Sequence, residues 1–341
     1  MLEQIPWDQV ATAIITIVIG VGGAVAYFWG ANWALDKFFS SDDTDPTQSA
    51  GRDRLRSGIR PWLFLLPALL FVTIYLVYPV IETLRLSFFD GSGRNFVGLS
   101  NWIWAFNSSD FHQSVFNNLL WLIVVPSLAT GFGLLVAVLA DRIWWGNIAK
   151  SMVFMPMAIS FVGASVIWKF VYDYRGPDAP QIGVLNALIQ AMGLEPQAWI
   201  AIPFWNSFFL MLILVWIQTG FAMVILSAAL RGIPEETLEA ARIDGASEVR
   251  IFFDIMVPQI MPTVLVVWTT ITIVVLKVFD IVLAMTGGQW DTQVLANLMY
   301  DQMFRSNHFG HGSTIALVIM IAVLPVMVWN IRQANSEQGT R

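Results

Sequence analysis

The sequence predicts an all-α integral membrane protein, and two observations support that prediction. Hydrophobic residues make up 57% of the 341 residues and charged residues only 12%, whereas a typical soluble domain has about 25% charged residues. The chain also contains seven segments that are long and apolar enough to cross a bilayer, which takes about 20 residues of helix. These segments cover residues 10–33, 62–88, 117–140, 151–172, 205–230, 261–285 and 313–331.

The first segment is predicted to be a retained transmembrane helix and not a cleaved signal peptide. The residues before it include Glu3 and Asp8 but no Lys or Arg, and its apolar run is longer than the core of a typical signal peptide. We therefore expect residues 1–33 to form a peripheral N-terminal helix beside the remaining six.

A polar linker is expected after this helix. Residues 40–58 mix Asp and Arg with Pro, Ser and Gly, and such a composition cannot bury enough apolar surface to fold alone. We assign residues 34–61 to a cytoplasmic linker, residues 62–331 to a six-helix core, and residues 332–341 to a cytoplasmic tail.

The basic residues predict the orientation in the membrane. Most Lys and Arg residues outside the apolar segments fall on the same side as the loop at 231–260, whereas Arg94, Arg175 and Arg305 fall on the other side. Because basic residues concentrate in cytoplasmic loops, we expect this loop and the C-terminus to be cytoplasmic and the N-terminus to be outside.

The polar loop between the fifth and sixth segments is predicted to form two short helices. Pro234 and the two glutamates after it suit the start of a helix, and Gly245 is a natural end. Ser247 then suits the cap of a second helix, from Glu248 to Met256, which Pro258 is expected to end.

This loop also has a specific spacing of residues. Glu239, Ala240 and Ala241 are followed by Gly245, and then by Ile255 and Pro258. In this arrangement it resembles the EAA loop of ABC importer permeases, although Val257 stands where that family usually has Leu. In the family an ATPase subunit grips the membrane subunit at this loop, so we call residues 231–260 the coupling loop.

The resemblance covers residues 60 to 332 and implies a permease of an ATP-driven importer in the bacterial cytoplasmic membrane. It implies a partner dimer of ABC ATPase subunits that would hold ATP and Mg, so no cofactor is expected in this chain. The residues that it assigns to ATPase coupling are Leu238, Glu239, Ala240, Ala241, Asp244, Gly245, Ile255 and Pro258.

A second resemblance concerns the cargo. The stretch Thr286 to Trp290, with Thr292, Val294, Leu295, Tyr300 and Phe304, resembles the external segment of maltose-type carbohydrate importers, with Gln289 where many relatives have Pro. The string from Gly288 to Asn297 is similar to permeases of bacterial α-glucoside importers. The resemblance is to the MalF-like subunit, which implies a second, different permease as partner and an extracytoplasmic sugar-binding protein that delivers the carbohydrate.

Polar residues within the apolar segments are candidates for sugar binding, because ionisable groups at the membrane midplane are costly and need a reason. Lys277 and Asp280 are expected on one face of the 261–285 helix, together with Thr270. Trp216, Gln218 and Thr219 lie in the middle of the 205–230 helix, where Trp216 could offer a flat apolar face to a pyranose ring. An equally good reading is that Lys277 and Asp280 merely neutralise each other in a packed bundle.

Other function classes find less support. The sequence has no G-x-x-x-x-G-K-[ST] phosphate loop, no Cys and three His residues, so neither an ATPase site nor a metal site is expected, and His308 and His311 fit a wet loop. The net charge of −6 suggests no nucleic-acid partner. The alternative to an importer permease is a secondary transporter of a small polar solute, in which Lys277 and Asp280 exchange a proton with the cargo.

Overall fold

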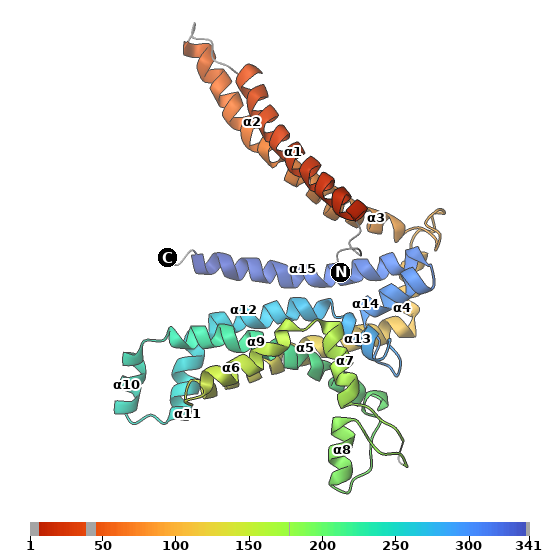
Figure 1. Ribbon diagram of the computed structural model, residues 1–341, viewed down its shortest axis with the longest axis vertical. Helices are drawn as coiled ribbons and strands as arrows, with labels where there is room; N and C mark the ends of the chain where they lie inside the picture. The colour runs from red at the N-terminus through yellow and green to blue at the C-terminus, as the bar shows by residue number, and fades with distance from the viewer. Residues whose placement is uncertain (1–6, 39–45, 177, 339–341) are drawn as a thin grey trace. The chain divides into compact units, whose positions relative to one another are not determined.

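The computed structural model describes residues 7–38, 46–176 and 178–338, and these are predominantly helical (Figure 1). Within these described ranges, six helices are long and apolar enough to cross a membrane, and a bent pair of helices can supply a seventh span. The prediction of an all-α membrane protein is therefore confirmed. The chain divides into two compact units, Met1–Glu82 and Thr83–Arg341, which we describe separately.

The first unit is a pair of long helices, α1 (Trp7–Phe38) and α2 (Pro46–Val72). They are joined by a hydrogen bond from the Tyr27 hydroxyl to the Leu63 carbonyl (2.7 Å), by stacking of Phe28 on Phe64, and by an ion pair between Asp36 and Arg56. These contacts lie in the second half of α1, and the residues of α1 before Tyr27 are exposed except for half-buried Val10.

The structure differs here from the expected linker at 34–61. Residues 34–38 continue α1, and α2 begins at Pro46, a residue that suits the first turn of a helix. Helix-forming Ala, Arg and Leu residues then carry α2 into the apolar segment without a break. Residues 39–45 of the expected linker lie outside the described residues.

A single wide turn precedes a proline in each of two helices. Residues Thr73–Val77 form a π-helical turn between α2 and α3 (Tyr78–Leu86), and the Tyr78 N–H bonds to the Thr73 carbonyl five residues back. Proline has no N–H, and its ring crowds the carbonyl four residues earlier in an α-helix. The wider turn gives Pro79 the room that an α-helical turn denies it.

The second unit is built around two long helices that run in the same direction, α5 (Ser109–Ala140) and α9 (Trp205–Arg231). Their interface contains fully buried Trp121, Leu210 and Met223. Gly133 on α5 lies directly against Ala222 on α9 with no room for a Cβ atom, which lets the two backbones approach closely. Helix α12 (Val257–Leu276) packs against both helices of this pair, and α15 (Phe309–Gln338) packs against α12 and the short helices at the start of α5.

The segment expected as one helix at 151–172 is broken. It consists of α6 (Gly146–Phe154), a 3₁₀ turn (Met155–Ala158) and α7 (Phe161–Val171), with a bend of 108°. Pro156 cannot donate the hydrogen bond that would continue α6. Ser160 then starts a new helix, because its hydroxyl accepts the Gly163 N–H at 3.1 Å.

The helix expected at 261–285 also ends early. Helix α12 stops at Leu276, and the N–H groups of Lys277 and Val278 bond three residues back, which tightens its last turn. The short helix α13 (Asp280–Met285) begins after this break. An acidic first residue favours a helix start, so Asp280 marks the beginning of a helix and not the interior of one.

Short helices complete the second unit. At the start of α5 lie α4 (Ser100–Asn107), α14 (Leu295–Tyr300) and the π-helical turn Asp301–Arg305, and a separate segment carries α8 (Val184–Ala191) and a 3₁₀ turn (Trp199–Ala201). Buried Asn186 organises the α8 segment, because its amide bonds Asp173, Gln197 and Trp199. Helix α15 runs past residue 331 to Gln338, so the expected tail begins as helix; residues 339–341 lie outside the described residues.

Candidate functional site

The first helix of the coupling loop, α10 (Glu235–Ile243), ends in a Schellman motif. The Gly245 N–H bonds to the Arg242 carbonyl (3.1 Å), and the Ala246 N–H bonds to the Ala241 carbonyl (3.0 Å). Gly245 has φ +81°, in the left-handed region, and a Cβ at this position would meet open space. The glycine is therefore required by the backbone conformation and not by crowding.

The second helix of the coupling loop begins as expected but does not end at Pro258. The Ser247 hydroxyl caps α11 (Glu248–Ile251) by accepting the Arg250 N–H. A π-helical turn, Phe252–Met256, then leads directly into α12, and the Val257 N–H bonds to the Phe252 carbonyl. As at Pro79, the wide turn accommodates the proline, so the expectation that Pro258 terminates the helix was wrong.

The residues assigned to ATPase coupling do not share one face. Glu239, Ala240, Asp244, Gly245 and Pro258 are exposed, whereas Ile255 is half-buried. Ala241 is buried, and Leu238 is half-buried and packs against the main core. The large exposed apolar side chains of this loop are instead Ile243, Val249 and Phe253, which are 85%, 68% and 62% exposed.

One carboxylate joins the two helices of the loop to the core. Glu248, the first residue of α11, accepts hydrogen bonds from Arg242 at 2.8 Å and from Arg142 at 3.0 Å. Arg242 lies at the end of α10, and Arg142 directly follows α5. The Glu248 hydrogen bond and charge raise the pKa of the Arg242 guanidinium above its ordinary value.

A second carboxylate beside it ties three core helices together. Asp141, which caps α5, pairs with Lys150 of α6 at 2.7 Å and with Arg231 of α9 at 2.9 Å. Ser227 of α9 also contacts Lys150 at 2.5 Å. Burial raises the pKa of Asp141, but the hydrogen bonds from Lys150 and Arg231 outweigh that effect and hold the pKa below its ordinary value.

A cleft of about 380 Å³ lies between the coupling loop and this end of the core. Acidic, basic and apolar side chains share its walls, and it contains both of the carboxylates described above. Its lining residues are Val138, Asp141, Arg142, Leu230, Arg231, Ile233, Glu235, Leu238, Arg242, Glu248 and Met256.

The candidate sugar-binding residues of α9 are in the interior of the helix, as expected. Gln218 and Thr219 are buried and Trp216 is half-buried. The Thr219 hydroxyl bonds to the Val215 carbonyl within the same helix. Within the described part of the chain, the Gln218 amide has no hydrogen-bond partner, although Gln218 is only 8% exposed.

The candidates around α12 are not arranged as expected. Lys277 caps the end of α12 and is exposed, whereas half-buried Asp280 opens α13, so the two do not lie on one face of one helix. Both line a small pocket with Phe161, Leu214 and Phe279. The two side chains form no ion pair among the described residues, and the Thr270 hydroxyl bonds to the Val266 carbonyl of its own helix.

The polar loop at 286–294, at the opposite end of α5, was singled out from the sequence, but the asparagines that bond to it were missed. The Asn117 amide donates to the carbonyls of Asp291 and Gln293, both at 2.7 Å, and the Asn118 side chain accepts the Leu295 N–H at 2.8 Å. The Asn206 amide of α9 donates to the Trp290 carbonyl at 2.5 Å. The signal in the sequence was the pair of adjacent asparagines, Asn117 and Asn118, at the start of an apolar segment.

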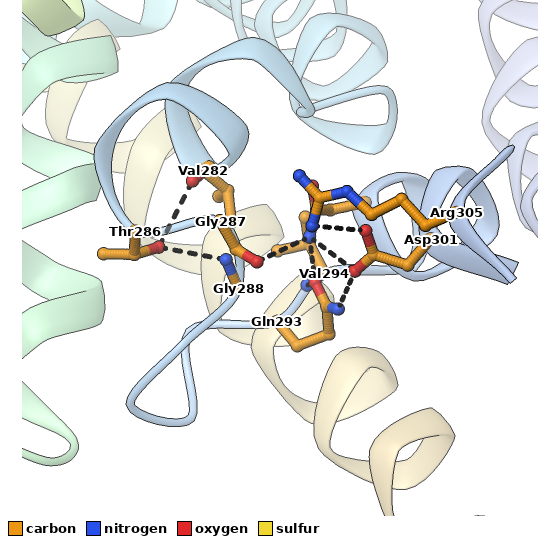
Figure 2. A network of polar contacts seen from close by, with 9 residues as sticks. Val282, Thr286, Gly287, Gly288, Gln293, Val294, Asp301 and Arg305 are labelled. Carbon is orange, nitrogen blue, oxygen red and sulfur yellow. Dashed lines mark hydrogen bonds and ion pairs between the residues drawn. The ribbon is translucent and has the colours of Figure 1, made fainter.

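A network of polar contacts holds the same loop from within (Figure 2). The Gln293 amide donates to Asp301 at 3.0 Å, and Asn297 donates to Gln293 at 2.6 Å. Asp301 also pairs with Arg305 at 3.0 Å. Outside this network, Trp290 and Asp291 have φ of +54° and +61°, which non-glycine residues adopt only when their surroundings enforce it.

The histidines expected in a wet loop are packed against each other. The His308 and His311 rings stack at a centroid distance of 3.5 Å, and His311 also stacks on Trp104 at 3.5 Å. His311 lies in the first turns of α15. The described residues contain no cluster of side chains suited to a metal ion.

Comparison with known proteins gives consistent matches. Residues 129–337, which include the coupling loop and the polar loop, match the family described as binding-protein-dependent transport system inner membrane component. The chain is 64% identical over 333 residues to the alpha-glucoside transport system permease protein AglF of Rhizobium meliloti (strain 1021), covering 97% of this chain and 99% of that protein. It is 51% identical over 279 residues to the osmoprotective compounds uptake permease protein GgtC of Synechocystis, covering 82% and 100%.

A solved structure shares the fold. The chain matches a bacterial ABC transporter involved in the import of the acidic polysaccharide alginate with a TM-score of 0.71 and 21% sequence identity. The match covers 83% of this chain and 99% of the other.

Proposed function

The chain belongs to the family of binding-protein-dependent transport system inner membrane components, and from this membership we infer that it is the permease subunit of an ATP-driven importer of α-glucosides. The observation that supports this function most directly is the coupling loop. Its two helices, with the Gly245 turn between them, are placed at one end of the α5 and α9 pair. The alternative of a proton-coupled carrier is not favoured, because the relatives are importer permeases and Lys277 and Asp280 do not pair.

The partner at the coupling loop is an ABC ATPase dimer, which binds ATP and Mg. The exposed surface available to it consists of Glu239 and Ala240 on α10 and the apolar side chains of Ile243, Val249 and Phe253. Exposed apolar side chains on a short helix pair suit docking into a groove of another protein. Leu238 is half-buried and Ala241 is buried, so neither contributes much to this exposed surface.

In this proposal the coupling loop and the C-terminus are cytoplasmic and the N-terminus is outside, as the distribution of Lys and Arg predicts. The polar loop at 286–294 is then extracytoplasmic, where a sugar-binding protein delivers the cargo. A second, different permease completes the membrane part of the importer.

The α-glucoside cargo is supported by the 64% identity to an alpha-glucoside permease over nearly the whole chain. We propose that the sugar is contacted from the middle of α9 and from the break between α12 and α13, where Trp216, Gln218 and Asp280 are the candidates. Thr219 and Thr270 are weaker candidates, because their hydroxyls already bond within their own helices. Lys277 stays a candidate as an exposed cation at the break.

Reconstitution into vesicles tests this function. The chain is purified with its partner permease and ATPase subunits, and uptake of a labelled α-glucoside is measured with the binding protein present. Uptake is expected to require both ATP and the ATPase subunit. Uptake by the membrane subunits alone under a proton gradient would contradict the proposal.

A further inference from the structure

Glu248 is the one described residue whose side chain joins the two coupling-loop helices to the rest of the unit by a hydrogen bond. Its carboxylate bonds Arg242 at the end of α10 and Arg142 at the end of α5. We propose that the Glu248–Arg142 contact is the latch through which movement of the coupling loop reaches α5. This inference rests on the proposed function, because it assumes that an ATPase moves the loop.

Apart from Arg231, the last residue of α9, which pairs with Asp141, the other side-chain polar contacts of the loop stay within it. Arg250 pairs with Asp254, and Ser247 bonds the Arg250 N–H. Leu238 adds apolar packing against the core, but such packing has no directional bond that would transmit a sliding or pulling movement. The loop also continues into α12, but it does so through the π-helical turn at Phe252–Met256. A π-helical turn is a frequent feature of functional sites.

Helix α5 is suited to carry the movement onward. Asp141 stands beside Arg142 and ties α6 and α9 to the same end of α5. The close contact between Gly133 and Ala222 keeps α5 and α9 together along their length. A displacement of Arg142 would therefore be transmitted to α5, α6 and α9 together.

The far end of α5 holds the polar loop. Asn117 and Asn118 bond the backbone of Asp291, Gln293 and Leu295. The 32 residues of α5 span about 48 Å at 1.5 Å per residue. One continuous helix, with Pro126 in its interior, therefore connects the coupling-loop end of the unit with the loop at the opposite end.

The latch is expected to matter for coupling more than for stability. Both side chains are about half exposed, and ion pairs in such positions add little to the stability of a fold. Glu248 is thus a positioning residue, and its loss should leave the folded protein and its docked ATPase in place.

The first test uses Glu248→Gln and Arg142→Gln in the complete importer. We expect each variant to keep normal amounts of copurified ATPase but to lose roughly three- to thirty-fold in sugar uptake per ATP hydrolysed, the range typical of residues that transmit coupling. Arg142→Lys is expected to retain most of the uptake. The matched control is Arg250→Gln, which removes an arginine of the same loop whose ion pair stays within the loop and should leave uptake per ATP unchanged.

The second test adds a reversible link. The chain contains no Cys, so a Glu248→Cys, Arg142→Cys double variant offers two unique thiols to a short bis-methanethiosulfonate crosslinker. Uptake per ATP is expected to be low before linking, to recover when the two positions are joined, and to fall again on reduction. Because one protein sample is compared with itself, a folding defect cannot produce this pattern.

Two outcomes would overturn the latch. One is normal uptake per ATP in Glu248→Gln and Arg142→Gln, and the other is no recovery when the two thiols are joined. Failure of the proposed function looks different, because the unaltered importer itself would then show no uptake that depends on ATP and the ATPase.

Discussion

Gly133 of α5 and Ala222 of α9 are in such close contact that the glycine has no space for a side chain. Gly131, two residues earlier, has nothing within 4 Å of the corresponding position. Substituting each glycine in turn therefore distinguishes the effect of packing from the effect of helix propensity, because only Gly133 lies in a crowded site.

We expect Gly133→Val to destabilise the purified chain by about 1–3 kcal/mol or more, because overpacking forces the two backbones apart. Gly131→Val is the control and should change the unfolding temperature in detergent far less. Equal unfolding temperatures for the two variants would contradict the close α5 and α9 packing.

Gly245→Asp is expected to abolish ATP hydrolysis coupled to transport without preventing membrane insertion. The left-handed backbone at Gly245 costs a residue with a Cβ about 1–2 kcal/mol, and the added charge stands beside Asp244. Gly245→Asn should be milder, because Asn tolerates this conformation better than most residues. Sugar uptake and ATPase rates in vesicles measure both, and unchanged uptake in Gly245→Asp would count against docking at this loop.

Asp141 makes the stability of the coupling-loop end dependent on pH. Its pKa is lower in the folded chain than in the unfolded chain, so its contribution is fully present above the ordinary carboxyl value near 4 and is lost as the pH falls through the lower, folded value. Asp141→Asn should therefore reduce stability at neutral pH by about 1 kcal/mol after allowance for solvent exposure, and the difference from the unaltered chain should shrink below about pH 4.

Thermal unfolding in detergent at several pH values checks this prediction. Asp254→Asn is the control, because its ion pair with Arg250 is largely exposed and should matter little at neutral pH. A difference between Asp141→Asn and the unaltered chain that grows toward low pH would have the wrong sign.

Asn117→Ala is expected to loosen the polar loop at 286–294. Asn117 is only 2% exposed, and its loss removes two part-buried hydrogen bonds to the carbonyls of Asp291 and Gln293, each worth about 0.5–1.5 kcal/mol. Amide hydrogen exchange in this loop should accelerate accordingly. Gln113→Ala removes a longer, more exposed bond of 3.2 Å to the Asp291 carbonyl and should have a smaller effect.

Gln218→Leu should separate sugar binding from stability. Removing an amide that has no hydrogen-bond partner among the described residues is expected to leave the unfolding temperature nearly unchanged. If Gln218 contacts the sugar, the same variant should lose about tenfold or more in uptake at low substrate concentration, since a lost hydrogen bond to a hydroxyl is worth about 1–2 kcal/mol. Unaltered uptake would remove Gln218 from the site.

The parts of this fold that depend on local chemistry could be predicted from the sequence. Gly245 ends α10 and Ser247 caps α11 because both act through bonds to neighbouring residues. The breaks at Pro156 and Lys277 were missed because apolar composition continues across them, and hydropathy carries no information on hydrogen-bond register. Glu248 and Arg142 are 106 residues apart, so their contact depends on how the helices pack and has no signal in either segment.

The π-helical turns before Pro79 and Pro258 change how the faces of these helices must be counted. Each such turn inserts one residue into the helical repeat, which rotates every later side chain by about 100° relative to an uninterrupted wheel. A wheel drawn straight through residues 248–276 would therefore misplace every side chain after residue 256 by more than a quarter of a turn. Cysteine scanning of this helix should be phased separately before and after residues 252–256.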